Sequence, residues 1–177
     1  VSTSSSEGQA NNYSYSPIFS SDGNKVAFYG SASNLVAGDT NGYADIFVKD
    51  LTTGAITRVS TTSSGSQATG GDSTNPVFSP DGNKVAFYSS ATNLVVGDTN
   101  LAYDIFVKDL TTGAITRVST SSSGSQANNS SAMPVFSPDG NKVAFYSSAS
   151  NLVAGDTNGA SDIFVKDLTT GVITRVS

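Results

Sequence analysis

Residues 79–120 read SPDGNKVAFYSSATNLVVGDTNLAYDIFVKDLTTGAITRVST, and close copies of this stretch begin at Ser20 and Ser137. The copies keep their register, because the turn glycine at residue 82 recurs 59 residues earlier and 58 residues later. A fixed period of this length is typical of repeat proteins, whose units bury their apolar faces against one another. The sequence therefore predicts three similar units, residues 1–58, 59–117 and 118–177.

The composition argues against several classes of protein. The 177 residues carry a net charge of −5 and place their few cations singly, which argues against nucleic-acid binding. Cysteine and histidine are both absent, which excludes thiol chemistry and removes the commonest general base and transition-metal ligand. No apolar run is long enough to cross a bilayer, and no signal-peptide pattern is present, so we expect no membrane insertion. Because the chain starts at Val1, we interpret it as a processed product or an excised piece.

Each unit predicts four short β-strands joined by tight turns. In the second unit, the S-P-D-G stretch suits a type I turn, with proline in the second position and glycine in the left-handed region. The T-T-G stretch makes another reversal, and no 3.6-residue apolar period persists long enough for a helix. Pro76 is expected at the start of the first strand, where a missing N–H is tolerated. We predict strands over residues 75–79, 84–89, 104–110 and 114–119.

The polarity of these strands predicts a β-propeller. The inner strands are apolar on both faces and the fourth is more polar, as expected when neighbouring blades cover each other and the last strand forms the outer rim. A β-solenoid usually has shorter coils without such paired turns, and a β-sandwich does not explain three equal units. The predicted fold class is therefore all-β, a β-propeller with three four-stranded antiparallel blades per chain.

A known family shares these motifs. Residues 76–89 and 134–147 both read PVFSPDGNKVAFYS, which resembles the TolB-type, WD40-like PD40 propeller repeat. The continuation N-L-V-x-G-D-T-N…D-I-F-V-K-D-L-T-T-G resembles a bacterial branch of that family. The first unit departs from the pattern, with Ser21 in place of the turn proline and Gly30 in place of a serine. The resemblance implies a propeller in a secreted or cell-envelope protein and leaves the activity open, because peptidase domains and uncharacterised proteins share the repeat.

Three blades do not close a propeller, which typically has four to eight. The end faces would be left bare, and large exposed apolar patches mark an interface or an aggregation hazard. We expect closure by oligomerisation in a head-to-tail ring, as a six-bladed homodimer or, as the alternative, a nine-bladed homotrimer. The other interpretation is a fragment of a longer chain that supplies the remaining blades.

The long loops are the expected binding surface. If strands alternate in direction, the two tight turns lie on one rim, and the long loops over residues 90–103 and 120–132 lie on the other. We expect a protein or glycan ligand there or at the mouth of the central channel. Glycan sites usually stack sugars on aromatic rings, but tryptophan is absent and the third unit does not repeat the candidates Tyr13, Tyr15, Tyr43 and Tyr103.

The motif G-D-T-N-G-x-x-D is the sharpest chemical signal. Closely spaced carboxylate and amide oxygens with a glycine at the bend resemble part of a calcium loop. The match is incomplete, because Ala37 and Ala154 occupy the first ligand position, Leu101 replaces one glycine and no glutamate ends the loop. The alternative is that these side chains cap their own turns. The candidate calcium ligands are Asp39, Asn41, Asp45, Asp98, Asn100, Asp104, Asp156, Asn158 and Asp162.

The repetition also argues against catalysis. An acid–base pair needs two carboxylates in unlike environments, whereas threefold copying makes the environments alike. We expect Asp81 to serve its turn, and Lys108 and Asp109 to pair with Arg117 across adjacent strands. The predicted function is a non-enzymatic propeller scaffold or binding module with an unknown ligand and no certain cofactor. A calcium-binding or glycan-binding propeller is the alternative, and a hydrolase is a more distant one.

Overall fold

The computed structural model describes residues 1–177, and β-strands are its only regular secondary structure. The strands form three four-stranded antiparallel sheets, which confirms the predicted all-β blades. The chain has no helix of the length and apolarity needed to span a membrane. Blade 1 contains β1 (Ser14–Phe19), β2 (Lys25–Gly30), β3 (Asp45–Asp50) and β4 (Ile56–Arg58); blade 2 contains β5 (Ser73–Phe78), β6 (Lys84–Ser89), β7 (Asp104–Asp109) and β8 (Ile115–Arg117); blade 3 contains β9 (Ser131–Phe136), β10 (Lys142–Ser147), β11 (Asp162–Asp167) and β12 (Ile173–Arg175).

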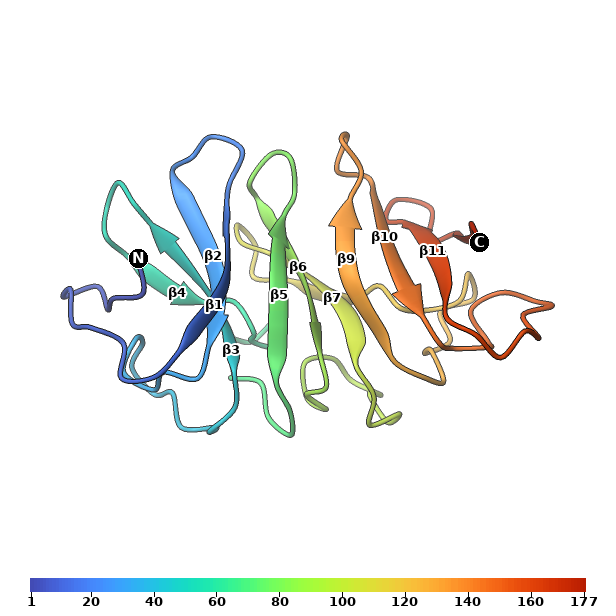
Figure 1. The fold of residues 1–177 in the computed structure, drawn as a ribbon, viewed down its shortest axis with the longest axis horizontal. Helices are drawn as coiled ribbons and strands as arrows, with labels where there is room; N and C mark the ends of the chain where they lie inside the picture. The colour runs from blue at the N-terminus through green and yellow to red at the C-terminus, as the bar shows by residue number, and fades with distance from the viewer.

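The blades fan out side by side along an arc (Figure 1). Strands β1, β5 and β9 contact one another across the blades, so the first strand of each blade lines the inner side of the arc. The hairpin turns after these strands lie along one rim, and the long connections to the third strands lie along the opposite rim. The two chain termini lie at opposite ends of the arc.

The aspartates of the tight turns hold those turns closed, as the sequence predicted. Asp81 accepts hydrogen bonds from the hydroxyl of Ser79 at 2.5 Å and from the backbone N–H of Asn83 at 3.1 Å. Gly82 adopts a φ of +68°, the left-handed conformation that this turn requires. Asp109 does the same work in the second turn, where it accepts the N–H groups of Thr111 and Thr112. These turns fix the register of the strands they join.

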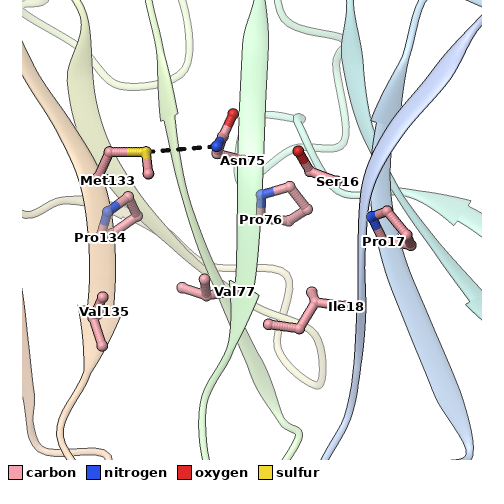
Figure 2. Close-up of a pocket in the computed structure, with 9 residues that line it drawn as sticks. All are labelled: Ser16, Pro17, Ile18, Asn75, Pro76, Val77, Met133, Pro134 and Val135. Atoms are coloured by element: carbon pink, nitrogen blue, oxygen red, sulfur yellow. Dashed lines mark hydrogen bonds between the residues drawn. The ribbon is translucent and has the colours of Figure 1, made fainter.

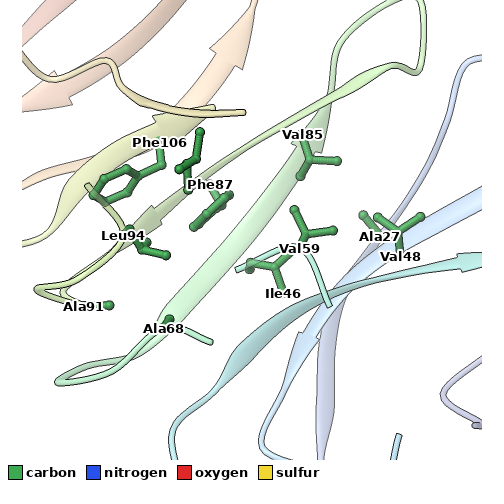
Figure 3. Packing of buried hydrophobic residues seen from close by; sticks show 11 residues of the cluster. Ala27, Ile46, Val48, Val59, Ala68, Val85, Phe87, Ala91, Leu94 and Phe106 are labelled. Atoms are coloured by element: carbon green, nitrogen blue, oxygen red, sulfur yellow. The ribbon is translucent and has the colours of Figure 1, made fainter. Parts of the chain in front are cut away.

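The core lies between neighbouring blades. We call the side of a blade that contacts the next blade its forward face, and the opposite side its rear face. Figure 3 shows the forward face of blade 1 against the rear face of blade 2, and an equivalent cluster joins blades 2 and 3. The forward face of blade 1 contributes Ala27, Ile46, Val48 and Val59, and the rear face of blade 2 contributes Val85, Phe87, Phe106 and Ile115.

The innermost strands differ from the prediction at the proline. Strand β5 begins at Ser73, upstream of Pro76, and its pairing with β6 shifts between Thr74 and Val77. Pro76 lacks an N–H and therefore sits in a β-bulge, where no ladder hydrogen bond is required of it. Asn75, the residue before it, has a φ of +52°. The same bulge recurs in each blade, which shows that it belongs to the repeat.

Candidate functional site

The G-D-T-N-G loop of blade 1 folds into a buried cluster centred on Arg58. The guanidinium Nη1 of Arg58 lies 3.1 Å from Oδ1 of Asp39 and 3.5 Å from Oδ2 of Asp45. The side chain of Asp45 is fully buried, and its other oxygen accepts a hydrogen bond from the hydroxyl of Ser60. The side-chain amide of Asn41 donates to Asp45 at 2.9 Å. The structure thus brings the three predicted residues together and adds two that the loop motif did not contain, Arg58 and Ser60.

The same cluster is built in the other two blades. In blade 2, Arg117 lies 3.4 Å from Asp98 and 3.8 Å from Asp104, and the amide of Asn100 donates to Asp104. In blade 3, Arg175 lies 3.1 Å from Asp156 and 3.7 Å from Asp162, to which Asn158 also donates. The arginine recurs at the same intervals as the aspartates, and this regularity is the sequence signal that could have assigned it to the cluster.

A guanidinium lies against the carboxylates that are the candidate calcium ligands. The oxygen of Asn41 accepts the backbone N–H of Tyr43, so the amide of Asn41 turns its nitrogen, not its oxygen, toward the carboxylate. No group of three or more acidic side chains gathers as a metal cage. Neither the predicted calcium site nor the predicted turn cap included the arginine. The calcium site stays a prediction.

Burial shifts the protonation of these carboxyl groups. Desolvation raises the pKa of Asp45 to about 6, although hydrogen bonds from Ser60 and Asn41 and the charge of Arg58 oppose the shift. Desolvation also raises the pKa of Asp39 and, together with the nearby charge of Asp104, that of Asp98. The three clusters are built from the same residue types in the same arrangement, so the repeats do not set one carboxyl group in surroundings unlike those of its copies.

The clusters of blades 1 and 2 are each completed by the blade that follows. The amide of Asn41 donates to the carbonyl of Ala68 at 3.0 Å, and that of Asn100 donates to the carbonyl of Ala127 at 2.9 Å. The glutamine before each alanine also reaches back to the cluster loop: Gln67 bonds Thr40, and Gln126 bonds Asp98 and Asp104. The clusters therefore tie neighbouring blades together as well as closing their own loops.

Lys108 and Asp109 do not pair with Arg117, so that prediction was wrong. In the β7–β8 register Lys108 lies opposite Ile115, and its ammonium donates to the carbonyls of Thr61 and Thr62 in the segment that links blades 1 and 2. Burial lowers the pKa of Lys108. Lys49 and Lys166 make the same contacts in their blades, so the lysines anchor the linkers.

The repeats differ most at one rim on the inner side of the arc, where a closed ring would have a mouth of its channel. Most aligned positions hold the same residue in at least two units, and only four hold three different residues. Three of these positions lie at the start of the innermost strand, and the fourth lies just before the third strand. The two regions touch, because the N–H of Ala44 donates to Asp72 and that of Tyr103 donates to Ser130. The four positions are 13/72/130, 15/74/132, 16/75/133 and 44/103/161, numbered in the three blades.

A shallow groove of about 260 Å³ crosses the innermost strands beside these positions (Figure 2). One of the four variable positions, held by Ser16, Asn75 and Met133, forms its upper row, with the amide of Asn75 donating to the sulfur of Met133 at 3.5 Å. The row of prolines and the row of Ile18, Val77 and Val135 continue it along the inner side of the arc. Tyrosines gather next to it: the rings of Tyr13, Tyr15 and Tyr29 contact one another in sequence at tilted angles, and Tyr88 meets Tyr103 edge-on.

Similar solved structures are propellers. One is a protein described as a TolB from Agrobacterium tumefaciens, with a TM-score of 0.58, 21% identity, and coverage of 93% of this chain and 48% of that one. Another is the propeller domain of the Trilobed protease from Pyrococcus furiosus, with a TM-score of 0.57, 17% identity, and coverage of 94% and 44%. A third is the acylaminoacyl peptidase of Pyrococcus horikoshii, with a TM-score of 0.55, 17% identity, and coverage of 93% and 25%.

These similarities establish the β-propeller fold and nothing about activity, because the identities are low. The chain spans about half or less of the length of these structures. No protein-family model matches the sequence, and no curated protein matches it.

Proposed function

We propose that this chain is a non-enzymatic propeller binding module whose ligand surface is the channel mouth formed by the four variable positions. The observation that carries the proposal is the contrast between repeats that are nearly identical in the core and charge clusters and different at this mouth. Positions that serve the fold stay alike in repeated blades, because each blade packs in the same way. Positions that differ in all three units and gather on one exposed surface are expected where a ligand is recognised.

The chemistry of the mouth suits a glycan or a protein surface. Tyr13 and Tyr15 are exposed, and tyrosine combines an apolar ring with a hydroxyl group. Asn75 and Met133 add an amide and an adaptable apolar side chain. The likeness to a TolB-type propeller supports a secreted or cell-envelope location for such a module.

The non-enzymatic part of the proposal rests on the carboxylates. The buried aspartates of the three loops are each held by an arginine and occur in near-identical copies. An acid–base mechanism would need two carboxyl groups whose surroundings separate their pKa values.

The experiment exchanges residues between blades, so that every introduced residue already suits the fold. The double variant Tyr13→Ser and Tyr15→Ala gives blade 1 the residues found at Ser130 and Ala132. We expect wild-type protein to bind members of an array of neutral and acidic oligosaccharides, and the double variant to lose that binding with little change in melting temperature.

The matched control is Ser33→Thr, which copies Thr92 of blade 2 outside the mouth and should leave binding intact. Binding that survives in the double variant would show that the site lies elsewhere. A wild-type protein that binds no oligosaccharide would exclude the glycan ligand and leave a protein ligand.

A further inference from the structure

Blade 3 exposes a forward face that blades 1 and 2 bury. Ile163 is 42% exposed, whereas Ile105 at the same position in blade 2 is fully buried. Val176 is 65% exposed, and its counterpart Val118 is 1% exposed. The residues have the same identity in both blades, so the difference comes only from the missing cover. A bare apolar face of this kind marks an interaction surface.

Blade 1 lacks cover on its rear face at the other end of the arc. Phe19 is 63% exposed, whereas the equivalent Phe78 and Phe136 are half-buried against the blade before them. A pocket of about 270 Å³ opens on this side between the chain start, the innermost strand and Phe28. The two ends of the arc are therefore complementary. Blade 3 has a forward face that no rear face covers, and blade 1 has a rear face that no forward face covers.

The charge cluster of blade 3 is also incomplete. Its Asn158 donates only to Asp162 and lacks the alanine carbonyl that the following blade supplies to Asn41 and Asn100. No glutamine reaches the loop of blade 3, and Arg175 is 30% exposed, compared with 11% for Arg117. The missing pair exists in the sequence as Gln9 and Ala10, which lie against blade 1 instead.

A backbone hydrogen bond is missing at the same end. The N–H of Ser73 donates to the carbonyl of Ala44 at 2.8 Å, and that of Ser131 donates to Tyr103 at 2.7 Å, so each blade is bonded to the next. The equivalent carbonyl in blade 3 belongs to Ser161 and receives no such bond, and the equivalent donor is Ser14 of blade 1.

We propose that blade 1 of a second copy of this chain covers the forward face of blade 3, so that two chains close head to tail into a six-bladed ring. The interface is already built twice within one chain, with the same residues on both sides. In the ring, the Gln9–Ala10 pair of each copy completes the Asp162 cluster of the other. Six is the only multiple of three in the usual range of four to eight blades, and each copy uses both of its end faces.

Closure requires one dipeptide to move. Val1 and Ser2 occupy the same place before blade 1 as Val59 and Ser60 occupy before blade 2. The N–H of Thr3 donates to the carbonyl of Val1 at 2.8 Å, and the N–H of Thr61 donates to the carbonyl of Val59 at 2.7 Å. In the ring this place belongs to Val176 and Ser177 of the neighbouring copy. Removing Val1 and Ser2 should therefore strengthen the association.

The mass in solution tests the proposal. Light scattering behind a sizing column should give twice the 18.0 kDa chain mass. The variant Ile163→Asp should be folded by circular dichroism and have the mass of one chain. The matched control Val96→Asp changes a fully exposed valine in a loop away from the face and should keep the doubled mass. A wild-type monomer, a different multiple, or an Ile163→Asp variant that still dimerises would overturn the six-bladed ring.

Cross-linking tests the geometry independently, and the absence of cysteine gives it a clean background. The side chains of Asn75 and Met133 meet across neighbouring innermost strands, and the ring would place Met133 of one copy beside Ser16 of the other in the same way. Under oxidation, the double variant Ser16→Cys and Met133→Cys should form a covalent dimer on a non-reducing gel. The control Asn75→Cys and Met133→Cys should form its disulfide within one chain. Absence of the covalent dimer in the first variant, with closure in the control, would contradict the head-to-tail arrangement.

Discussion

Blades 2 and 3 have almost the same sequence and different surroundings. Strands β6 and β10 both read KVAFYS, and β7 and β11 both read DIFVKD. All five residues from Asp104 to Lys108 are buried in blade 2, whereas Ile163 in the matching strand of blade 3 is exposed. The comparison shows that in a repeat protein the sequence of a strand does not decide which of its faces is core. The neighbouring blade decides it.

The same difference predicts an uneven distribution of stability. Blade 2 shares an apolar interface with a blade on each side, whereas blades 1 and 3 share only one each. In repeat proteins, stability is approximately the sum of unit terms and nearest-neighbour interface terms. We therefore expect blade 2 to be the best protected against opening in a single chain, and the three blades to be protected alike once a second copy covers both end faces.

The largest effect is expected for Ile105→Asp. Ile105 is fully buried between blades 2 and 3, and an unpaired carboxylate there should cost several kcal/mol, comparable with a total stability of about 5–15 kcal/mol. We expect this variant to be unfolded in circular dichroism, while Ile163→Asp at the same position of blade 3 folds. A cooperative melt of Ile105→Asp near the wild-type temperature would contradict the assignment of this face to the core.

The next largest effect distinguishes the arginine cluster of blade 2 from that of blade 3. Arg117→Ala leaves Asp98 and Asp104 buried without a cation, for which we expect a loss of about 3 kcal/mol in the free energy of unfolding. In the monomeric background of Ile163→Asp, Arg175→Ala should cost less than Arg117→Ala by about 1 kcal/mol or more, because water already reaches this cluster in a single chain. Urea unfolding of both variants measures the difference. Equal losses at concentrations where the protein is dimeric, and unequal losses in the background of Ile163→Asp, would show that the second copy closes the third cluster.

The sequence predicted the repeat, the strands and the turn aspartates because each depends on local chemistry. Strand β6 has the predicted bounds, and Asp81 caps its turn as expected. The pairing of Arg117 with Asp98 was missed because Asp98 lies in a long loop whose path follows from packing, not from strand pairing. The opposing position in the ladder is Phe106, so the rule for cross-strand charge pairs did not apply.

The bulge at the innermost strands was also missed, and for a physical reason. A residue before proline usually adopts an extended conformation, which favours a strand that begins near Pro76. Asn75 takes a left-handed conformation instead, at the point where the pairing register between β5 and β6 shifts. The two end faces could be predicted from the number of blades alone, whereas the completion of each charge cluster by the next blade required the coordinates.

The stability of the protein should depend on pH in opposite ways at the buried clusters and at the exposed turns. The folded protein keeps a proton on Asp45 up to about pH 6, whereas the unfolded chain loses it near pH 4. This contribution to stability is therefore lost as the pH rises through this window, by an amount on the order of 2 kcal/mol. The turn residue Asp22 behaves oppositely, because hydrogen bonds from Ser20 and Asn24 lower its pKa to about 2, and its contribution is lost as the pH falls below 4.

Melting temperatures measured from pH 3 to 7 test this contrast between variants. Asp45→Asn should flatten the slope between pH 4 and 6, whatever its effect on absolute stability, and Asp22→Asn should change only the slope below pH 4. A profile for Asp45→Asn that runs parallel to wild type between pH 4 and 6 would show that this carboxyl group titrates normally in the folded state.

The smallest expected effect is that of calcium on the wild-type protein. A bound ion stabilises the folded state by mass action, but the carboxylates of all three loops already pair with a guanidinium. We expect no change in melting temperature when millimolar calcium is added to chelated protein. Arg175→Ala sharpens this test, because it leaves Asp156 and Asp162 without a cation in the most accessible cluster. If that variant gains stability with calcium while the wild type does not, the loops have the oxygens for a calcium site and the arginine takes its place. A rise in the wild type itself would mean that the guanidinium yields to the ion, and that the G-D-T-N-G loops bind calcium in the intact protein.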